Sequence, residues 1–177
     1  GDVDGATVQS QIALEAPIAN DLIEGVRLAG ATMGMRGSSP SQSANLTFAP
    51  ARFDQGLKVG GGTKVGWSIE IPSEFSTTFD VRLDQVLDEP TVYLALTGSS
   101  GTLRLIWSPE NNAFALEDDF GQRVIASLVR RSGDIITFGI CQTPTARKLF
   151  AASAQTGLSA SGVEPFLPLG AFSGAQL

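Results

Sequence analysis

The sequence predicts an all-β fold, an antiparallel two-sheet β-sandwich, and three observations carry this prediction. Apolar and polar residues alternate with period two in most segments from about residue 46 onward, as they do in half-buried strands. These segments recur about every ten residues, the spacing typical of sandwiches and barrels. Turn-forming residues separate them, helped by 20 glycines and nine prolines spread along the chain, and no helical pattern intervenes.

The clearest predicted strand runs from Phe75 to Asp84. Its apolar face carries Phe75, Phe79 and Leu83, and its charged residues fall on the opposite face. The connection Ser132-Gly133 predicts a tight hairpin. The other predicted strands are Lys64–Ile71, Thr91–Thr97, Thr102–Ser108, Ala113–Asp118, Arg123–Arg131, Asp134–Cys141 and Arg147–Ala152.

The first 45 residues follow a different pattern from the rest. Val8–Leu14 has the composition of a strand, and Ala19–Val26 that of a short helical segment. We therefore expect residues 1–45 to form an N-terminal arm, extra strands or a linker, and residues 46–177 to form one sandwich domain. Pro165–Leu177 is expected to supply a closing strand.

Composition excludes several classes of partner. The net charge of -6 argues against nucleic acid, whose phosphates require patches of Lys and Arg. It argues equally against an anionic membrane surface. No apolar run approaches the roughly 20 residues of a transmembrane helix, so we expect no membrane insertion.

The chain contains no histidine and a single cysteine. The absence of histidine removes His-based acid–base catalysis, Ser-His-Asp triads and His-ligated metals. Cys141 has no second cysteine for a disulfide and stands in an apolar run, so we expect it to be a buried small hydrophobic residue.

Several segments, in order and spacing, resemble the laminin-G-like branch of the concanavalin A-like lectin/glucanase superfamily. The most specific combination is Phe53–Val59, similar to "Phe-x-x-Gly-Leu-x-Val", followed by the aromatic strand Phe75–Leu83. Weaker similarities follow at Gly101–Leu105, Gly133–Phe138 and Arg147–Phe150. The resemblance covers about residues 46 to 172 and implies a jelly roll that binds glycans or cell surfaces.

Relatives of that fold include glycoside hydrolases, which need two facing carboxylates. The candidates here are Glu70, Glu74, Asp80 and Asp84. Pro72 interrupts the strand between Glu70 and Glu74, and Arg82 between the two aspartates indicates charge pairing on a solvated surface. We therefore expect no enzymatic activity.

Calcium is the cofactor consistent with the resemblance. Glu117, Asp118 and Asp119 supply hard oxygen ligands at one end of a predicted strand. Asn111 and Asn112 lie at its opposite end. The acidic run is either a metal site or a solvated turn, and the sequence leaves both readings open.

The aromatic residues suggest where a ligand would bind. Trp67 and Trp107 share strand faces with aliphatic residues, so we expect both to lie in the core. Tyr93 is predicted to face the opposite side of its strand and is the best exposed aromatic. Tyr93, Asn111 and Asn112 are therefore the predicted ligand-binding residues.

Two functional hypotheses follow. The first is a non-catalytic lectin-like module that binds a glycan or a protein surface. The second is a structural protein of a virion or fibre that docks to a neighbour through its first 45 residues. Whether the chain also forms a homo-oligomer is left open by the sequence. Both predict an extracellular or virion-surface location.

Overall fold

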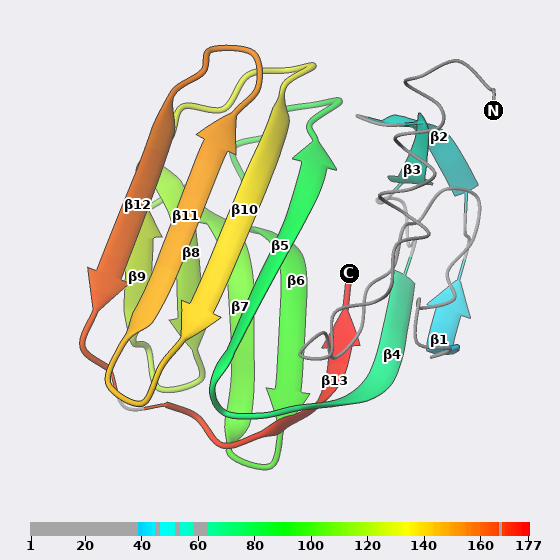
Figure 1. Ribbon diagram of the computed structural model, residues 1–177. Helices are drawn as coiled ribbons and strands as arrows, with labels where there is room; N and C mark the ends of the chain where they lie inside the picture. Colours follow the sequence, from blue (N-terminus) through cyan, green and yellow to red (C-terminus); the bar gives the residue numbers. More distant parts are fainter. Residues whose placement is uncertain (1–38, 45–46, 52–53, 59–63, 167) are drawn as a thin grey trace, which may run out of the picture.

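The computed structural model describes residues 39–44, 47–51, 54–58, 64–166 and 168–177. Within these ranges the regular secondary structure consists of β-strands, so the predicted all-β class is confirmed (Figure 1). No helix in the same ranges is long and apolar enough to cross a membrane.

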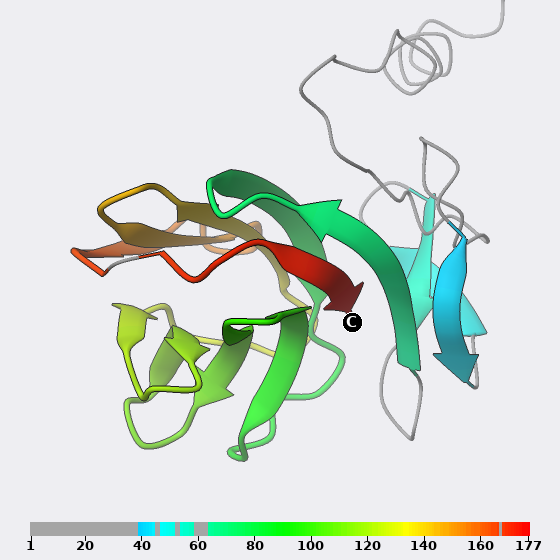
Figure 2. The same cartoon turned by 90° about the horizontal axis from the view of Figure 1, so that it is seen from below.

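Two antiparallel sheets pack face to face, as the sequence predicts, and Figure 2 shows them as separate layers. In spatial order the larger sheet contains β1 (Pro40–Ala44), β4 (Lys64–Ile71), β13 (Phe172–Gln176), β6 (Thr91–Gly98), β7 (Gly101–Ser108), β8 (Ala113–Asp118) and β9 (Arg123–Ala126). The smaller sheet contains β12 (Ser159–Glu164), β11 (Arg147–Ser153), β10 (Ile135–Gln142) and β5 (Phe75–Arg82). A separate pair is formed by β2 (Thr47–Ala51) and β3 (Asp54–Lys58).

The core lies between these two sheets and follows the period-two alternation. In β10, Ile136, Phe138 and Ile140 are buried, and Phe75 and Leu83 on the β5 side of the same sheet belong to the same core cluster. Phe138 meets Phe114 of β8 edge to face, with ring centroids 4.8 Å apart. Each such side chain contributes about 1.5–3 kcal/mol through its burial.

The connection between β9 and β10 differs from the prediction. β9 ends at Ala126, because the chain then leaves the larger sheet and crosses to the smaller one. Ser132-Gly133 therefore does not form a two-residue hairpin between neighbouring strands. Gly133 has a φ of 83°, and its N–H donates to the carbonyl of Leu83 at 2.6 Å.

The strands near the two ends of the chain can be compared with the predicted domain limits. β1 falls inside the predicted arm but pairs with β4 of the larger sheet. β3 carries most of the Phe53–Val59 motif, yet it pairs with β2 and with neither sandwich sheet. The closing strand is β13, which inserts between β4 and β6. Val8–Leu14 and Ala19–Val26 lie outside the described residues.

A buried ion pair joins the two sheets near one end of the sandwich. Arg147 of β11 donates through Nη1 to Oδ2 of Asp118 of β8 at 2.7 Å, and the two side chains are 1% and 0% exposed. The other carboxylate oxygen accepts the backbone N–H groups of Phe120 and Gln122, which fixes the β8–β9 turn. These bonds offset the cost of burying two charges.

Gln142 extends this pair into a network. Its Oε1 accepts from Nε of Arg147 at 3.1 Å, and its Nε2 donates to the carbonyls of Ser73 and Leu169. Ser73 precedes β5, and Leu169 precedes β13. The network therefore ties β8, β10, β11 and the entrances to β5 and β13 together at one end.

Asp134 organises the opposite end of the sandwich. Its side chain is 1% exposed and accepts hydrogen bonds from the Ser153 hydroxyl and from the backbone N–H groups of Ile135 and Gln155. Its carbonyl accepts from the N–H of Leu83 at 2.8 Å. The loops 83–90, 127–134 and 154–158 are thereby fixed to one another; we call this the loop end.

Replacing Arg147 with Met should lower the free energy of unfolding by about 3–5 kcal/mol, because it leaves the buried Asp118 carboxylate without its counter-charge. Urea denaturation followed by fluorescence measures the loss. The control Arg104→Met breaks an exposed pair with Asp119 and should cost about 0–1 kcal/mol. Equal losses in the two variants would contradict this account of the interior network.

Candidate functional site

The outer face of the smaller sheet carries a shallow depression of about 320 Å³. Its middle row crosses the four strands in register: Ser161 of β12 pairs with Phe150, Phe150 with Gly139, and Gly139 with Thr78 of β5. All four residues line the depression. The row arises because alternate residues of each strand face away from the core.

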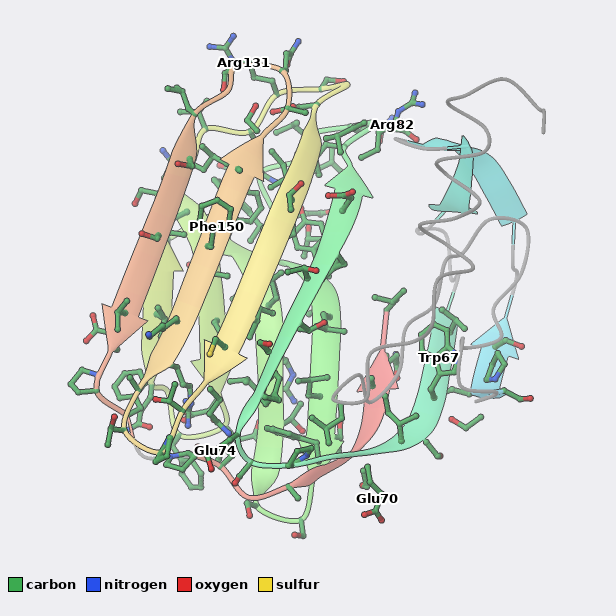
Figure 3. The ribbon with its side chains drawn as sticks, viewed as in Figure 1. Trp67, Glu70, Glu74, Arg82, Arg131 and Phe150 are labelled. Atoms are coloured by element: carbon green, nitrogen blue, oxygen red, sulfur yellow. The ribbon has the colours of Figure 1, made fainter. Side chains whose placement is uncertain are left out.

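Phe150 is the exposed aromatic of this face. Its side chain is 43% exposed, and Figure 3 shows the ring projecting from β11 on the side away from the larger sheet. Gly139 lies beside it on β10, and a Cβ atom at Gly139 would stand 3.6 Å from Cβ of Phe150. Because glycine has no side chain, the space beside the ring stays open.

The neighbouring row contains Val163, Lys148, Cys141 and Ser76, again in register across the strands. All four line the same depression. Cys141 is a free thiol, and it is partly exposed rather than buried as predicted. The reason is the alternation of β10, which directs Ile140 into the core and so turns Cys141 outward.

This arrangement has the chemistry of a binding surface. An exposed ring offers an apolar platform, and the surface of the depression is almost wholly apolar, although Ser76, Thr78 and Ser161 are among its lining residues. No carboxylate is among the residues that line the depression. The acids proposed for catalysis or metal binding lie elsewhere.

The predicted exposure of Tyr93 is wrong. The β6–β7 register shifts between Val92 and Leu94, so the bulge turns Val92 outward, where it is 55% exposed. The Tyr93 ring packs inward, 6.0 Å from the ring of Phe114 and 5.8 Å from that of Phe138. Burial raises the pKa of Tyr93, against an opposing hydrogen bond with Arg130. The ring is therefore partly buried and packs against the core.

The predicted metal ligands separate in the structure. Asp118 faces inward to Arg147, whereas Glu117 pairs with Arg123 at 2.9 Å and Asp119 pairs with Arg104 at 2.7 Å. Each of the three carboxylates thus forms an ion pair with a different arginine. Among the described residues, no group of three His, Cys, Asp or Glu side chains is placed to hold a metal ion. The three carboxylates of the acidic run therefore do not meet at one point.

Asn111 and Asn112 form the exposed β7–β8 turn. Nδ2 of Asn111 donates to Oγ of Ser108 at 2.8 Å, and Asn112 has a φ of 48°, the left-handed conformation that asparagine tolerates in turns. Both residues connect two strands of the larger sheet and lie outside the depression. Their role in ligand binding stays a prediction.

The four carboxylates considered for catalysis are all exposed. Figure 3 shows Glu70 and Glu74 at one end of the sandwich, away from Phe150. Asp80 accepts a hydrogen bond from the Thr137 hydroxyl, and Asp84 pairs with Arg82 at 3.0 Å. The charge pairing predicted around Arg82 is confirmed for Asp84.

Phe150 and Gly139 are the site residues that the sequence reasoning missed. A usable signal was present, because in Lys148-Leu149-Phe150 the apolar Leu149 must face inward and so turns its neighbours outward. The partnership with Gly139 depends on the β10–β11 register, which the sequence does not display.

No protein-family model matches the chain, and no curated protein matches it in sequence. Several solved structures share its fold. Domain 4 of AbnA, a GH43 extracellular arabinanase from Geobacillus stearothermophilus solved in complex with arabinotriose, is 11% identical with a TM-score of 0.52. The match covers 84% of this chain and 85% of that domain.

Two tailspike structures are also similar. The enzymatically active domain of tailspike protein 2 of bacteriophage CBA120 is 12% identical with a TM-score of 0.54, over 77% of this chain. Full-length tailspike protein 2 from an Escherichia coli O157:H7 bacteriophage is 13% identical with a TM-score of 0.53. The chain spans only 25% and 22% of their lengths. These likenesses show the fold.

The variant Asp119→Asn tests the charge pairing that replaces the metal site. Hydrogen bonds from the Arg104 side chain and the Thr102 N–H lower the pKa of Asp119 below its usual 3.8. A lowered folded-state pKa stabilises the fold above the unfolded pKa, and this contribution disappears as the pH falls through the folded value. The melting-temperature difference between wild type and variant should therefore be largest near neutral pH and shrink as the pH falls below 3.8. A constant difference would contradict the pairing.

Proposed function

We propose that this chain is a non-catalytic, lectin-like module that binds a glycan on the outer face of its smaller sheet. One observation carries the proposal: the exposed ring of Phe150 stands beside the open space at Gly139 in an apolar depression. Sugars present apolar C–H faces, and an exposed ring in an apolar depression matches them.

The distribution of titratable groups supports binding without catalysis. The sequence has no histidine, and Glu70, Glu74, Asp80 and Asp84 are exposed and outside the depression. Glycoside hydrolysis needs two carboxylates on either side of the scissile bond. A sugar lying on Phe150 would meet no such pair among the described residues.

The structural neighbours support a glycan-related, extracellular or virion-surface setting. One is an arabinanase domain solved with arabinotriose, and two come from phage tailspikes. The strands β5, β7, β10 and β11 carry segments that resemble laminin-G-like domains, whereas most of the Phe53–Val59 motif falls on β3, outside both sheets. The proposal of a jelly roll of that kind therefore rests on the four strands alone. The tailspikes' own activities belong to chains several times longer than this one.

A second candidate function is assembly within a virion or fibre. The loop end exposes Val86, Leu87, Val129 and Leu158 from its three tied loops. Clustered apolar side chains on a fixed surface are typical of contacts between proteins. A second copy of this chain or a neighbouring virion protein would bury them.

Light scattering coupled to size-exclusion chromatography, with a glycan array probed by the same sample, separates the two functions. The glycan-binding proposal predicts one clear family of bound glycans. A stable trimer or larger oligomer without any bound glycan would overturn it in favour of assembly.

Replacing Phe150 with Ala should weaken binding of the glycan found on the array by about threefold to tenfold, the value of a lost aromatic platform. Titration calorimetry gives the affinities. Phe120→Ala is the matched control, because Phe120 is 73% exposed on the β8–β9 turn, away from the depression. Equal affinities for both variants would count against the proposed face.

Replacing Gly139 with Thr should abolish binding while leaving the fold intact. The new Cβ would make ordinary contact with Phe150, and threonine favours strands, so the free energy of unfolding should stay the same or rise by up to about 1 kcal/mol. Its side chain would occupy the space beside the ring. Thermal unfolding and calorimetry on one sample check both parts; undiminished binding by a stable variant would refute the role of that space.

A further inference from the structure

Lys148 is the cation of the depression. It lies two residues before Phe150 on β11, so the two side chains leave the same face of the strand with backbones about 6.6 Å apart. Both line the depression, and Lys148 is exposed. A ligand lying on the Phe150 ring would therefore reach the lysine ammonium.

Lys148 has no counter-ion among the described residues. The ion pairs between described residues all join carboxylates to arginines. Asp84 pairs with Arg82, Asp119 with Arg104, Glu110 and Glu117 with Arg123, and Asp118 with Arg147. No carboxylate among the described residues lies within ion-pair distance of Lys148, and none lines the depression. On a chain of net charge -6, Lys148 is thus the one charged residue among those that line the depression.

We propose that the ligand is an acidic glycan, whose sugar ring lies on Phe150 and whose carboxylate or sulfate accepts hydrogen bonds from Nζ of Lys148. This inference rests on the proposed glycan-binding function and specifies the class of glycan. Because the pair would be solvent-exposed, its contribution to binding is modest and falls as salt rises.

The test compares acidic sugars with their neutral counterparts. The probes are an oligogalacturonate and its methyl ester, and a sulfated oligosaccharide and its desulfated form, so that each pair differs only in charge. Calorimetry at low and high salt measures the affinities. Wild type should bind at least one acidic form about threefold to fivefold more tightly than its neutral form at low salt.

Lys148→Met should remove this preference and leave the affinity for the neutral form unchanged. Arg131→Met, an exposed cation at the loop end, is the matched control and should keep the preference (Figure 3). Equal binding of acidic and neutral forms by wild type, or a preference that survives in Lys148→Met, would overturn the inference while the glycan-binding function stands. Binding of neither form in either pair would overturn the inference, whereas the glycan-binding function is decided by the glycan array.

Discussion

The rest of the structure depends on the buried pair between Arg147 and Asp118. It joins the two sheets, and through Gln142 it reaches the segments that enter β5 and β13. Removing one partner of such a pair leaves an unpaired charge in the interior, so neither residue can turn outward without a large loss of stability. The pair therefore fixes how β11 faces the core.

The candidate site follows from that orientation. Because Arg147 and Leu149 face inward, Lys148 and Phe150 must face outward. The register with β10 then sets Gly139 beside the ring, and the register with β12 sets Ser161 on its other side. A buried polar network thus fixes the strand face on which a ligand would lie. The residues that line this face come from strands, and the loops at either end of the sandwich contribute none of them.

Much of the fold could be predicted from period-two alternation, including the two sheets and the inward face of β5. The errors arose where local sequence does not reveal tertiary context. A bulge in β6 turns Tyr93 inward. Asp118 pairs with the buried Arg147 and so points away from its acidic neighbours. The β10–β11 register places Phe150 beside Gly139. From the local sequence alone, Asp118 is predicted to be a solvated turn residue. Its partner Arg147 lies 29 positions away in the sequence, so local sequence does not reveal that Asp118 faces inward.

The alkylation rate of Cys141 tests the central claim most directly. This thiol is the chain's single cysteine and lines the depression, so it reports on that face alone. A saturating amount of the glycan identified on the array should slow its reaction with a maleimide, because the sugar on Phe150 would cover it. An unchanged rate at saturation would show that the glycan binds elsewhere and would contradict the account.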